Sequence, residues 1–251
     1  MENTNNTKSK LEIILEKKKY RKLSGSTLKS IALVTMIIDH VSKYILSQTE
    51  FATSPLLTSF FSGMTVCSLM ELIGRIAFPL YAFLITEGYV HTRDKKKYGR
   101  NLFIFAVISE FPWNLEHTGN FFYCEQNVFF TLFLGYLAIY VYERFKENKP
   151  YLLVSLMVIF VISLVLNADY GSKGVGFIFL LYILRERKIL RTFCGCCWFD
   201  AWIYLVAFIP INMYNGERGF IKGKILKYAF YIIYPAHLLI IFLIRKTVYG
   251  Y

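Results

Sequence analysis

Long apolar stretches, separated by short polar runs, dominate this chain. The clearest stretches are Leu28–Leu46, Leu72–Val90, Val128–Tyr142 and Ile225–Ile244. Shorter ones lie at 101–113, 151–166, 175–184 and 198–211. A helix needs roughly 20 apolar residues to cross the hydrocarbon core of a bilayer. The pattern therefore predicts an all-α, polytopic helical membrane protein with about eight transmembrane helices.

Two places interrupt this pattern. Residues 56–70 are moderately apolar, contain Gly63 and are short for a span, so they are expected to form a re-entrant or surface-lying segment. Pro79 lies inside the stretch Leu72–Val90 and predicts a kink in that span.

Basic runs flank the apolar stretches and set the expected orientation. Seven Lys and Arg residues precede the first span, and further runs lie at 93–100 and 185–191. The positive-inside rule then predicts a multi-pass protein of the cell membrane with both termini in the cytosol. Counting the spans predicts that segment 214–227 lies outside the cell. This segment contains Arg218 and Lys227, so we expect these cations to have a function there.

Composition narrows the possible classes of protein. The net charge is +12 over 251 residues, but the cations sit beside apolar segments, so membrane topology rather than nucleic-acid binding explains them. Residues 1–24 lack the continuous apolar core of a signal peptide and are expected to form a basic, amphipathic cytosolic tail on anionic lipid. Residues 25–251 form one transmembrane domain. Cys194, Cys196 and Cys197 have no nearby His and are interpreted as membrane-edge thiols, and no metal site is predicted.

The first span carries three charged or titratable side chains, Asp39, His40 and Lys43. A charge at the centre of a membrane helix costs roughly 2.5–3.5 kcal/mol, so such a cluster indicates function. Asp39 and His40 diverge by about 100° on a helix, which excludes a direct Asp–His dyad. Asp39 and Lys43 have the i,i+4 spacing of an ion pair, which leaves His40 to face a cavity. The alternative is a packed polar cluster that joins helices.

Other polar residues lie at membrane depth in the remaining stretches: Arg75, Glu87, Glu110, Asp169 and His237. Glu87 and His91 repeat the i,i+4 spacing. Taken singly, each residue suits a structural role. Together with His40, they predict a polar, watered cavity within the membrane, with Glu110 and His237 at a depth similar to that of His40.

These residues also carry a family likeness. The chain resembles the TraX family of integral-membrane acyltransferases from about residue 25 to 245. The matching blocks, in order, are Leu28–Ala32, Met36–His40, Ile73–Leu80, Thr86–Tyr89, His91–Arg93, Ile108–Pro112, Thr131–Leu132, Asp169–Gly171, Tyr214–Gly219 and Lys227–Leu238.

The resemblance implies acetyl transfer from cytosolic acetyl-CoA to an acceptor across the membrane, with His40 in the catalytic role. His40 would act as general base or carry the acyl group briefly, with Asp39, Glu110 and His237 beside it. Arg75 or Lys43 could stabilise an oxyanion. The cations Arg93, Lys97 and Arg100 are expected to hold the CoA phosphates.

The acceptor would offer an amine or hydroxyl, on a protein N-terminus, a glycan or a lipid. Lys43, Glu87, Asp169 and Arg218 are the residues expected to bind it. Two other functions fit the same membrane charges: a proton-coupled transporter, and a non-catalytic subunit of a conjugation or secretion apparatus. No internal repeat supports the transporter, and the subunit predicts that His40 is dispensable.

Overall fold

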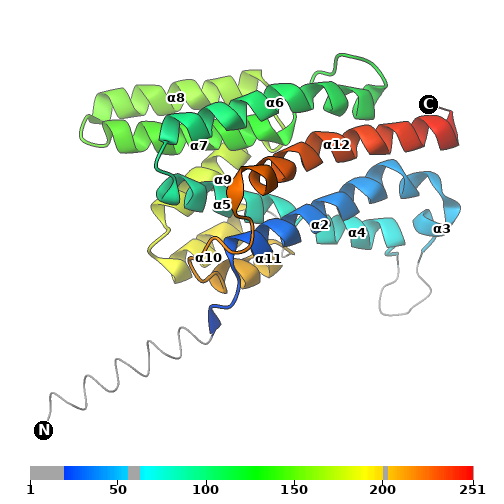
Figure 1. The fold of residues 1–251 in the computed structure, drawn as a ribbon, viewed down its shortest axis with the longest axis horizontal. Coiled ribbons are helices and arrows are strands. Elements are labelled where there is room, and N and C mark those ends of the chain that lie inside the picture. The colour runs from blue at the N-terminus through cyan, green and yellow to red at the C-terminus, as the bar shows by residue number, and fades with distance from the viewer. Residues whose placement is uncertain (1–19, 56–62, 200–202, 251) are drawn as a thin grey trace, which may run out of the picture.

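A computed structural model describes residues 20–55, 63–199 and 203–250, and this part of the chain is helical, without strands (Figure 1). This confirms the all-α prediction. The helices are α2 (Gly25–Tyr44), the 3₁₀ turn η1 (Leu46–Gln48), α3 (Glu50–Thr53), α4 (Val66–Gly74), α5 (Ala77–His91), α6 (Lys95–Thr118), α7 (Val128–Phe145), α8 (Lys149–Val165), α9 (Gly171–Ile183), α10 (Lys188–Trp198), α11 (Ile203–Asn212) and α12 (Gly223–Tyr249).

Four of the described segments are long and apolar enough to cross a membrane: Gly25–Gln48, Val66–His91, Val128–Phe145 and Gly223–Tyr249. Helices α8, α9 and α11 are apolar but shorter. Their exposed faces, such as Val154, Val158 and Val161 on α8, suit contact with lipid. The chain is therefore a helical membrane protein, but the predicted count of eight spans is not established.

The predicted span at 198–211 is replaced by a short helical hairpin. Helix α11 has 10 residues, which at 1.5 Å per residue is about half the thickness of the hydrocarbon core. It runs back along α10, because Arg191 near the start of α10 donates to Asn212 at the end of α11 (3.1 Å). Gly195 lets the two helices approach, since a Cβ there would lie 2.1 Å from the Phe208 ring.

This hairpin places α2 and α12 side by side and parallel. The start of α2 is joined to the segment that leads into α12 by Leu23 N–H to Met213 O (3.1 Å) and Ser26 N–H to Arg218 O (2.9 Å). Their ends are joined by the Tyr249 hydroxyl, which donates to Ile45 O (3.2 Å). Segment 214–227 thus lies at the start of the first span, and its predicted position at the opposite end is wrong. Residue 249 lies at the far end of this helix pair from residue 25, and the predicted cytosolic position of both termini stays a prediction.

The predicted kink in the second clear span is a full break. Helix α4 ends at Gly74 and α5 begins at Ala77, so Pro79 falls in the first turn of α5, where a missing N–H is tolerated. Helix α4 packs closely on α2, since a Cβ on Gly74 would lie 2.2 Å from Asp39 Cβ. Residues 56–62 of the predicted re-entrant segment, and residues 1–19 of the predicted tail, lie outside the described residues.

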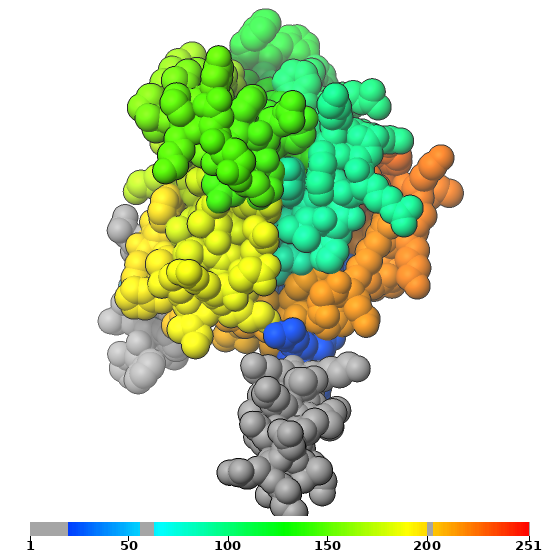
Figure 2. Space-filling model, turned by 90° about the vertical axis from the view of Figure 1, so that its left-hand side faces the viewer, coloured from blue at the N-terminus to red at the C-terminus, as the bar shows by residue number. Residues whose placement is uncertain are grey.

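Basic side chains gather at one end of the molecule, which we call the basic end. It comprises the starts of α2, α6, α8, α10 and α12 and the ends of α5, α7 and α9. The ends of α7 and α9 meet where the Tyr182 hydroxyl donates to Glu143 (2.8 Å). Figure 2 looks onto this end, where the chain near residue 20 (blue) lies beside the start of α12 (orange) and the segment around α10 (yellow).

Candidate functional site

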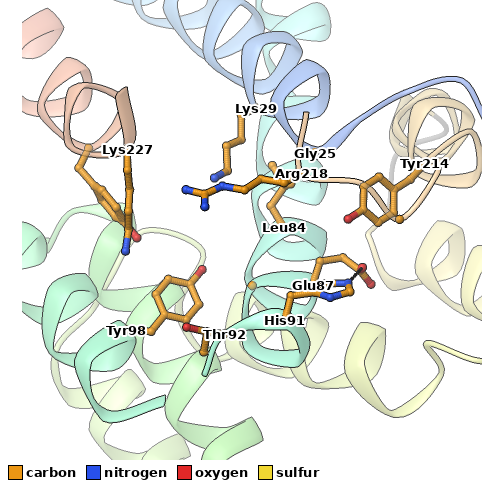
Figure 3. Close-up of a pocket in the computed structure, with 13 residues that line it drawn as sticks. Gly25, Lys29, Leu84, Glu87, His91, Thr92, Tyr98, Tyr214, Arg218 and Lys227 are labelled. Carbon is orange, nitrogen blue, oxygen red and sulfur yellow. Dashed lines mark ion pairs between the residues drawn. The ribbon is translucent and has the colours of Figure 1, made fainter. Parts of the chain in front are cut away.

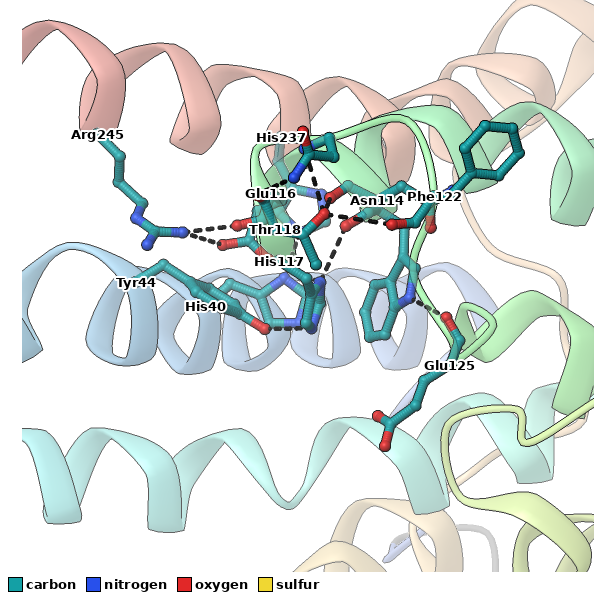
Figure 4. Close-up of polar contacts among 12 residues, drawn as sticks. His40, Tyr44, Asn114, Glu116, His117, Thr118, Phe122, Glu125, His237 and Arg245 are labelled. Carbon is teal, nitrogen blue, oxygen red and sulfur yellow. Dashed lines mark hydrogen bonds and ion pairs between the residues drawn. The ribbon is translucent and has the colours of Figure 1, made fainter. Parts of the chain in front are cut away.

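The two membrane histidines that the sequence singled out lie in direct contact. His40 on α2 and His237 on α12 are joined by a hydrogen bond of 2.8 Å between His40 Nδ1 and His237 Nε2 (Figure 4). Their rings stack with centroids 4.9 Å apart. The parallel packing of α2 and α12 brings them together across 197 residues of sequence.

Hydrogen-bond partners assign the tautomer of each ring. His237 Nδ1 lies 3.1 Å from the Ile233 carbonyl, which can only accept, so this nitrogen carries the proton. In neutral His237, Nε2 is then an acceptor, and His40 Nδ1–H must donate to it. The second nitrogen of His40, Nε2, therefore keeps its lone pair. The hydrogen bond to His237 thus fixes the tautomer and the orientation of the His40 ring.

A second polar pair, Tyr44 and His117, lies one turn along α2. His117 Nδ1–H donates to the Trp113 carbonyl (2.9 Å), so the Tyr44 hydroxyl donates to His117 Nε2 (2.7 Å). The Tyr44 ring meets His40 edge-on, with centroids 5.9 Å apart. The sequence singled out neither residue. Tyr44 is an uncharged residue within the first span, and the predicted apolar stretch at 101–113 stops before His117, whereas α6 continues to Thr118. The unbroken helical register beyond Pro112 was the available signal.

A buried ion pair closes this cluster on the side away from the basic end. Arg245 Nη1 on α12 donates to the Glu116 carbonyl at 2.6 Å and lies 3.4 Å from its carboxylate, which is fully buried. The pair compensates two charges that would each be costly alone. Arg245 carried no sequence signal beyond a basic helix end, because its partner lies 129 residues away.

Asp39 and Lys43 form the predicted i,i+4 ion pair, with Lys43 Nζ 2.6 Å from Asp39 Oδ2. Asp39 faces α4, where it packs on Gly74. His40 bonds to His237 instead. The predicted divergence of Asp39 and His40 therefore matches the geometry.

Glu110 does not join the histidine pair. Its carboxylate accepts from the Asn127 side chain (2.5 Å), and Asn127 caps the start of α7 by accepting from Phe129 N–H (3.0 Å). Glu110 thus stabilises the start of α7 through its capping residue. Arg75 is exposed at the break between α4 and α5 and lines neither cavity described below.

Asp169 lies in the tight turn between α8 and α9. Its main-chain carbonyl accepts from the Thr131 hydroxyl, and its neighbour Tyr170 has a φ of +66°. Burial raises the pKa of the Asp169 carboxyl to about 6, and the Lys43 ammonium partly opposes that shift. Asp169 and Lys43 therefore lie toward the same end of the molecule, away from the basic end.

A cavity of about 340 Å³ opens at the basic end between the starts of α2 and α12 and the end of α5 (Figure 3). It is lined by Lys29, Glu87, His91, Tyr98, Arg218 and Lys227, among others. Glu87 and His91 form the contact that their spacing predicted, at 3.4 Å. The four residues expected to bind the acceptor are thus divided, with Glu87 and Arg218 here and Lys43 and Asp169 toward the opposite end.

The cations expected to hold CoA phosphates lie beside this cavity and do not line it. Arg93 is exposed in the turn after α5, and Lys97 and Arg100 are exposed on the first turns of α6. Their neighbours Thr92 and Tyr98 line the cavity instead. The cavity draws its cations from α2, α12 and the segment between α11 and α12.

A smaller apolar cavity of about 90 Å³ continues from the basic one. The two share Lys29, Leu84, Tyr98, Lys227 and Tyr231 as lining residues. Tyr234 also lines the apolar cavity, and its ring lies edge-on to His237 with centroids 5.4 Å apart. The side chains that line both cavities therefore lie between the basic end and the histidine pair.

Comparison with known proteins gives a family and one named relative. Residues 24–245 match the family model described as "TraX protein". The chain is 26% identical over 246 residues to "Probable fimbrial assembly protein FimC, serogroup H1" of Dichelobacter nodosus, with 86% of this chain and 93% of that protein covered. No solved structure matches the chain.

Proposed function

Because the chain belongs to the TraX family, we propose that it is a membrane acyltransferase that moves an acetyl group from acetyl-CoA to an amine or hydroxyl of an acceptor. The observation that carries this proposal is the locked tautomer of His40. His237 accepts from His40 Nδ1–H, and so His40 Nε2 keeps the lone pair that acyl transfer requires.

The reaction proposed for His40 needs no reactant other than acetyl-CoA and the acceptor. As general base, Nε2 removes the proton from the acceptor while the acceptor nitrogen or oxygen attacks the thioester carbonyl. The carbon–sulfur bond then breaks, and the thiolate leaves as a thiol with the proton from the imidazolium. Alternatively, Nε2 attacks the carbonyl itself and passes the acetyl group to the acceptor in a second step.

Orientation follows from the basic end. The positive-inside rule assigns this end to the cytosol, where acetyl-CoA would enter, and the membrane in question would be the cell membrane. The acceptor would approach from the opposite end, where Tyr44, His117 and Lys43 lie. The name of the relative, a probable fimbrial assembly protein, favours a protein amine as acceptor over a glycan or lipid.

Proton-coupled transport is a second candidate, favoured by the polar side chains that follow one another along α2. Two hydrogen-bonded pairs, His237 with His40 and Tyr44 with His117, follow one another there. Three of the four residues lie on helices long and apolar enough to cross a membrane. Such pairs suit proton movement. Transport, however, requires no reaction with a thioester.

The two functions separate in a thiol-release assay. Purified protein in lipid nanodiscs receives acetyl-CoA and a peptide with a free N-terminus, and the released thiol is measured. We expect release with the wild type, and loss in His40→Asn. Ser47→Ala is the control, because this hydroxyl bonds only to the Lys43 carbonyl among the described contacts. Absent thiol release, or equal release by His40→Asn, would contradict the enzyme.

A further inference from the structure

Three cations from separate segments converge on the basic cavity. Lys29 comes from α2, Arg218 from the segment before α12, and Lys227 from α12 itself. Figure 3 shows Lys29 and Arg218 pointing into the space that Lys227 faces from the other side. Their convergence does not follow from sequence proximity, since Lys29 and Arg218 are far apart in the chain.

The three cations lack a protein counterion in the part of the chain that the structure describes. None of them forms an ion pair with a carboxylate there. Glu87 is the one acidic side chain among the residues that line the cavity, and it faces His91 at 3.4 Å. Three like charges in a partly enclosed space repel one another, so a bound anion would stabilise their arrangement.

The segment that presents Arg218 is fixed by the main chain. Ser26 is almost fully buried, and its hydroxyl donates to the Arg218 carbonyl (2.6 Å) while accepting from Ile221 N–H (2.8 Å). Gly25 N–H donates to Glu217 O (2.8 Å). Arg218 is therefore held at the mouth of the cavity by the start of α2.

Aromatic hydroxyls complete the lining. Burial, together with the nearby Glu87 carboxylate, raises the pKa of Tyr214 to about 12, so its hydroxyl stays protonated at neutral pH. Tyr98 and Tyr231 stand where the basic cavity meets the apolar one. Along α2, Lys29 and His40 are separated by a rise of about 16 Å, which a ligand with an extended arm could bridge.

We propose that the basic cavity binds a phosphate ester that carries a long uncharged arm, with Lys29, Arg218 and Lys227 holding the phosphates and the arm lying in the apolar cavity. The inference rests on the proposed function where the ligand is acetyl-CoA. Phosphate esters also occur as lipid headgroups, and the experiment distinguishes these two sources.

Direct binding tests the site. Wild-type protein in nanodiscs of phosphatidylcholine is titrated with CoA and with adenosine 3′,5′-bisphosphate by calorimetry. The variant Lys29→Gln/Arg218→Gln/Lys227→Gln is expected to weaken both by at least tenfold. The control Arg144→Gln/Lys149→Gln/Arg187→Gln changes the same charge at the same end, outside the cavity, and should keep the wild-type Kd.

A third variant tests whether the exposed cations at 93–100, rather than the cations of the cavity, bind the phosphates. Arg93→Gln/Lys97→Gln/Arg100→Gln should bind CoA as the wild type does. Loss of binding in this variant, with retention in the cavity variant, would overturn the proposal. Wild-type binding by a cavity variant that keeps its thermal unfolding temperature would also overturn it.

Lipid is tested by co-purification. Retention of phosphatidylglycerol by the wild type but not by the cavity variant, without binding of soluble CoA, keeps the phosphate site and assigns it to a headgroup. Retention of neither ligand contradicts the site.

His40→Asn separates the site from the reaction, because His40 lines neither cavity. If CoA binds equally to the wild type and to His40→Asn but no acetyl transfer occurs, the site stands and the proposed function fails. If transfer occurs while the cavity variant binds CoA normally, the function stands and the site fails.

Discussion

At the scale of single residues, the hydrogen-bond partner of each imidazole nitrogen decides which nitrogen carries the proton. His237 has a carbonyl on one side and His40 on the other, so its proton position is fixed by a group that can only accept. His40 inherits its tautomer from this arrangement. In the proposed reaction, His237 would therefore be a positioning residue that acts through His40.

We predict that His237→Leu lowers kcat of acetyl transfer by about 100-fold, because His40 would lose the partner that fixes its tautomer. His237→Gln should recover part of the rate, since its amide oxygen can accept from His40 Nδ1–H. The readout is kcat with its pH profile. Equal rates in the Leu and Gln variants would show that His237 only fills space.

Asp169 gives a prediction for pH. Its pKa is raised by burial from 3.8 to about 6, so the folded state binds more protons than the unfolded state between these values. The contribution of Asp169 to stability is therefore lost as pH rises from about 4 to above 6. Thermal unfolding of Asp169→Asn, followed from pH 4 to 7.5, should lack this component and gain relative stability above pH 6. A constant difference from the wild type across that range would contradict the raised pKa.

At the scale of elements, close packing of α4 on α2 positions the span that carries His40. A Cβ at Gly74 would lie 2.2 Å from Asp39 Cβ, which is backbone-proximal and cannot rotate away. At Gly25, the nearest atom to an added Cβ is 3.5 Å away, an ordinary contact. A Cβ can therefore be added at Gly25 without a clash, whereas a Cβ at Gly74 would clash with Asp39.

We predict that Gly74→Ala destabilises the protein by about 1–3 kcal/mol, because α4 must move away from α2. Gly25→Ala should unfold at the wild-type temperature. Differential scanning fluorimetry in detergent compares the two. Equal unfolding temperatures for both variants would show that α2 and α4 are not closely packed at Gly74.

At the scale of the whole molecule, local spacing was predictable and long-range pairing was not. Helix class followed from apolar length, and the contacts of Asp39 with Lys43 and of Glu87 with His91 followed from one helical turn. The contacts of Tyr44 with His117 and of Glu116 with Arg245 join residues 73 and 129 positions apart, which no spacing rule reaches.

The differences between the expected and the observed course of the chain near its C-terminal part share one cause. Each apolar block was counted as a crossing, but α11 is too short and returns along α10. That one hairpin moves Arg218 and Lys227 to the basic end and reverses the direction expected for α12. The exposed cations at 93–100, which were expected to hold phosphates, do not line the basic cavity. Charge that follows the positive-inside rule and charge that binds a ligand look alike in a sequence.

We predict that the two ends of the described chain lie on opposite sides of the membrane. In a bacterial host, fluorescent protein fused before residue 20 should fluoresce, while the same protein fused after residue 250 should stay dark and alkaline phosphatase there should be active. Fluorescence of both fusions would contradict this prediction and would support a topology with both termini in the cytosol.

The most direct test of the central claim is acetyl transfer at matched donor binding. Wild-type and His40→Asn proteins in nanodiscs are saturated with radiolabelled acetyl-CoA, equal occupancy is verified, and a peptide with a free N-terminus is added. We expect label on the peptide with the wild type and none above background with His40→Asn. Label transferred at the wild-type rate by His40→Asn would contradict the catalytic role of His40.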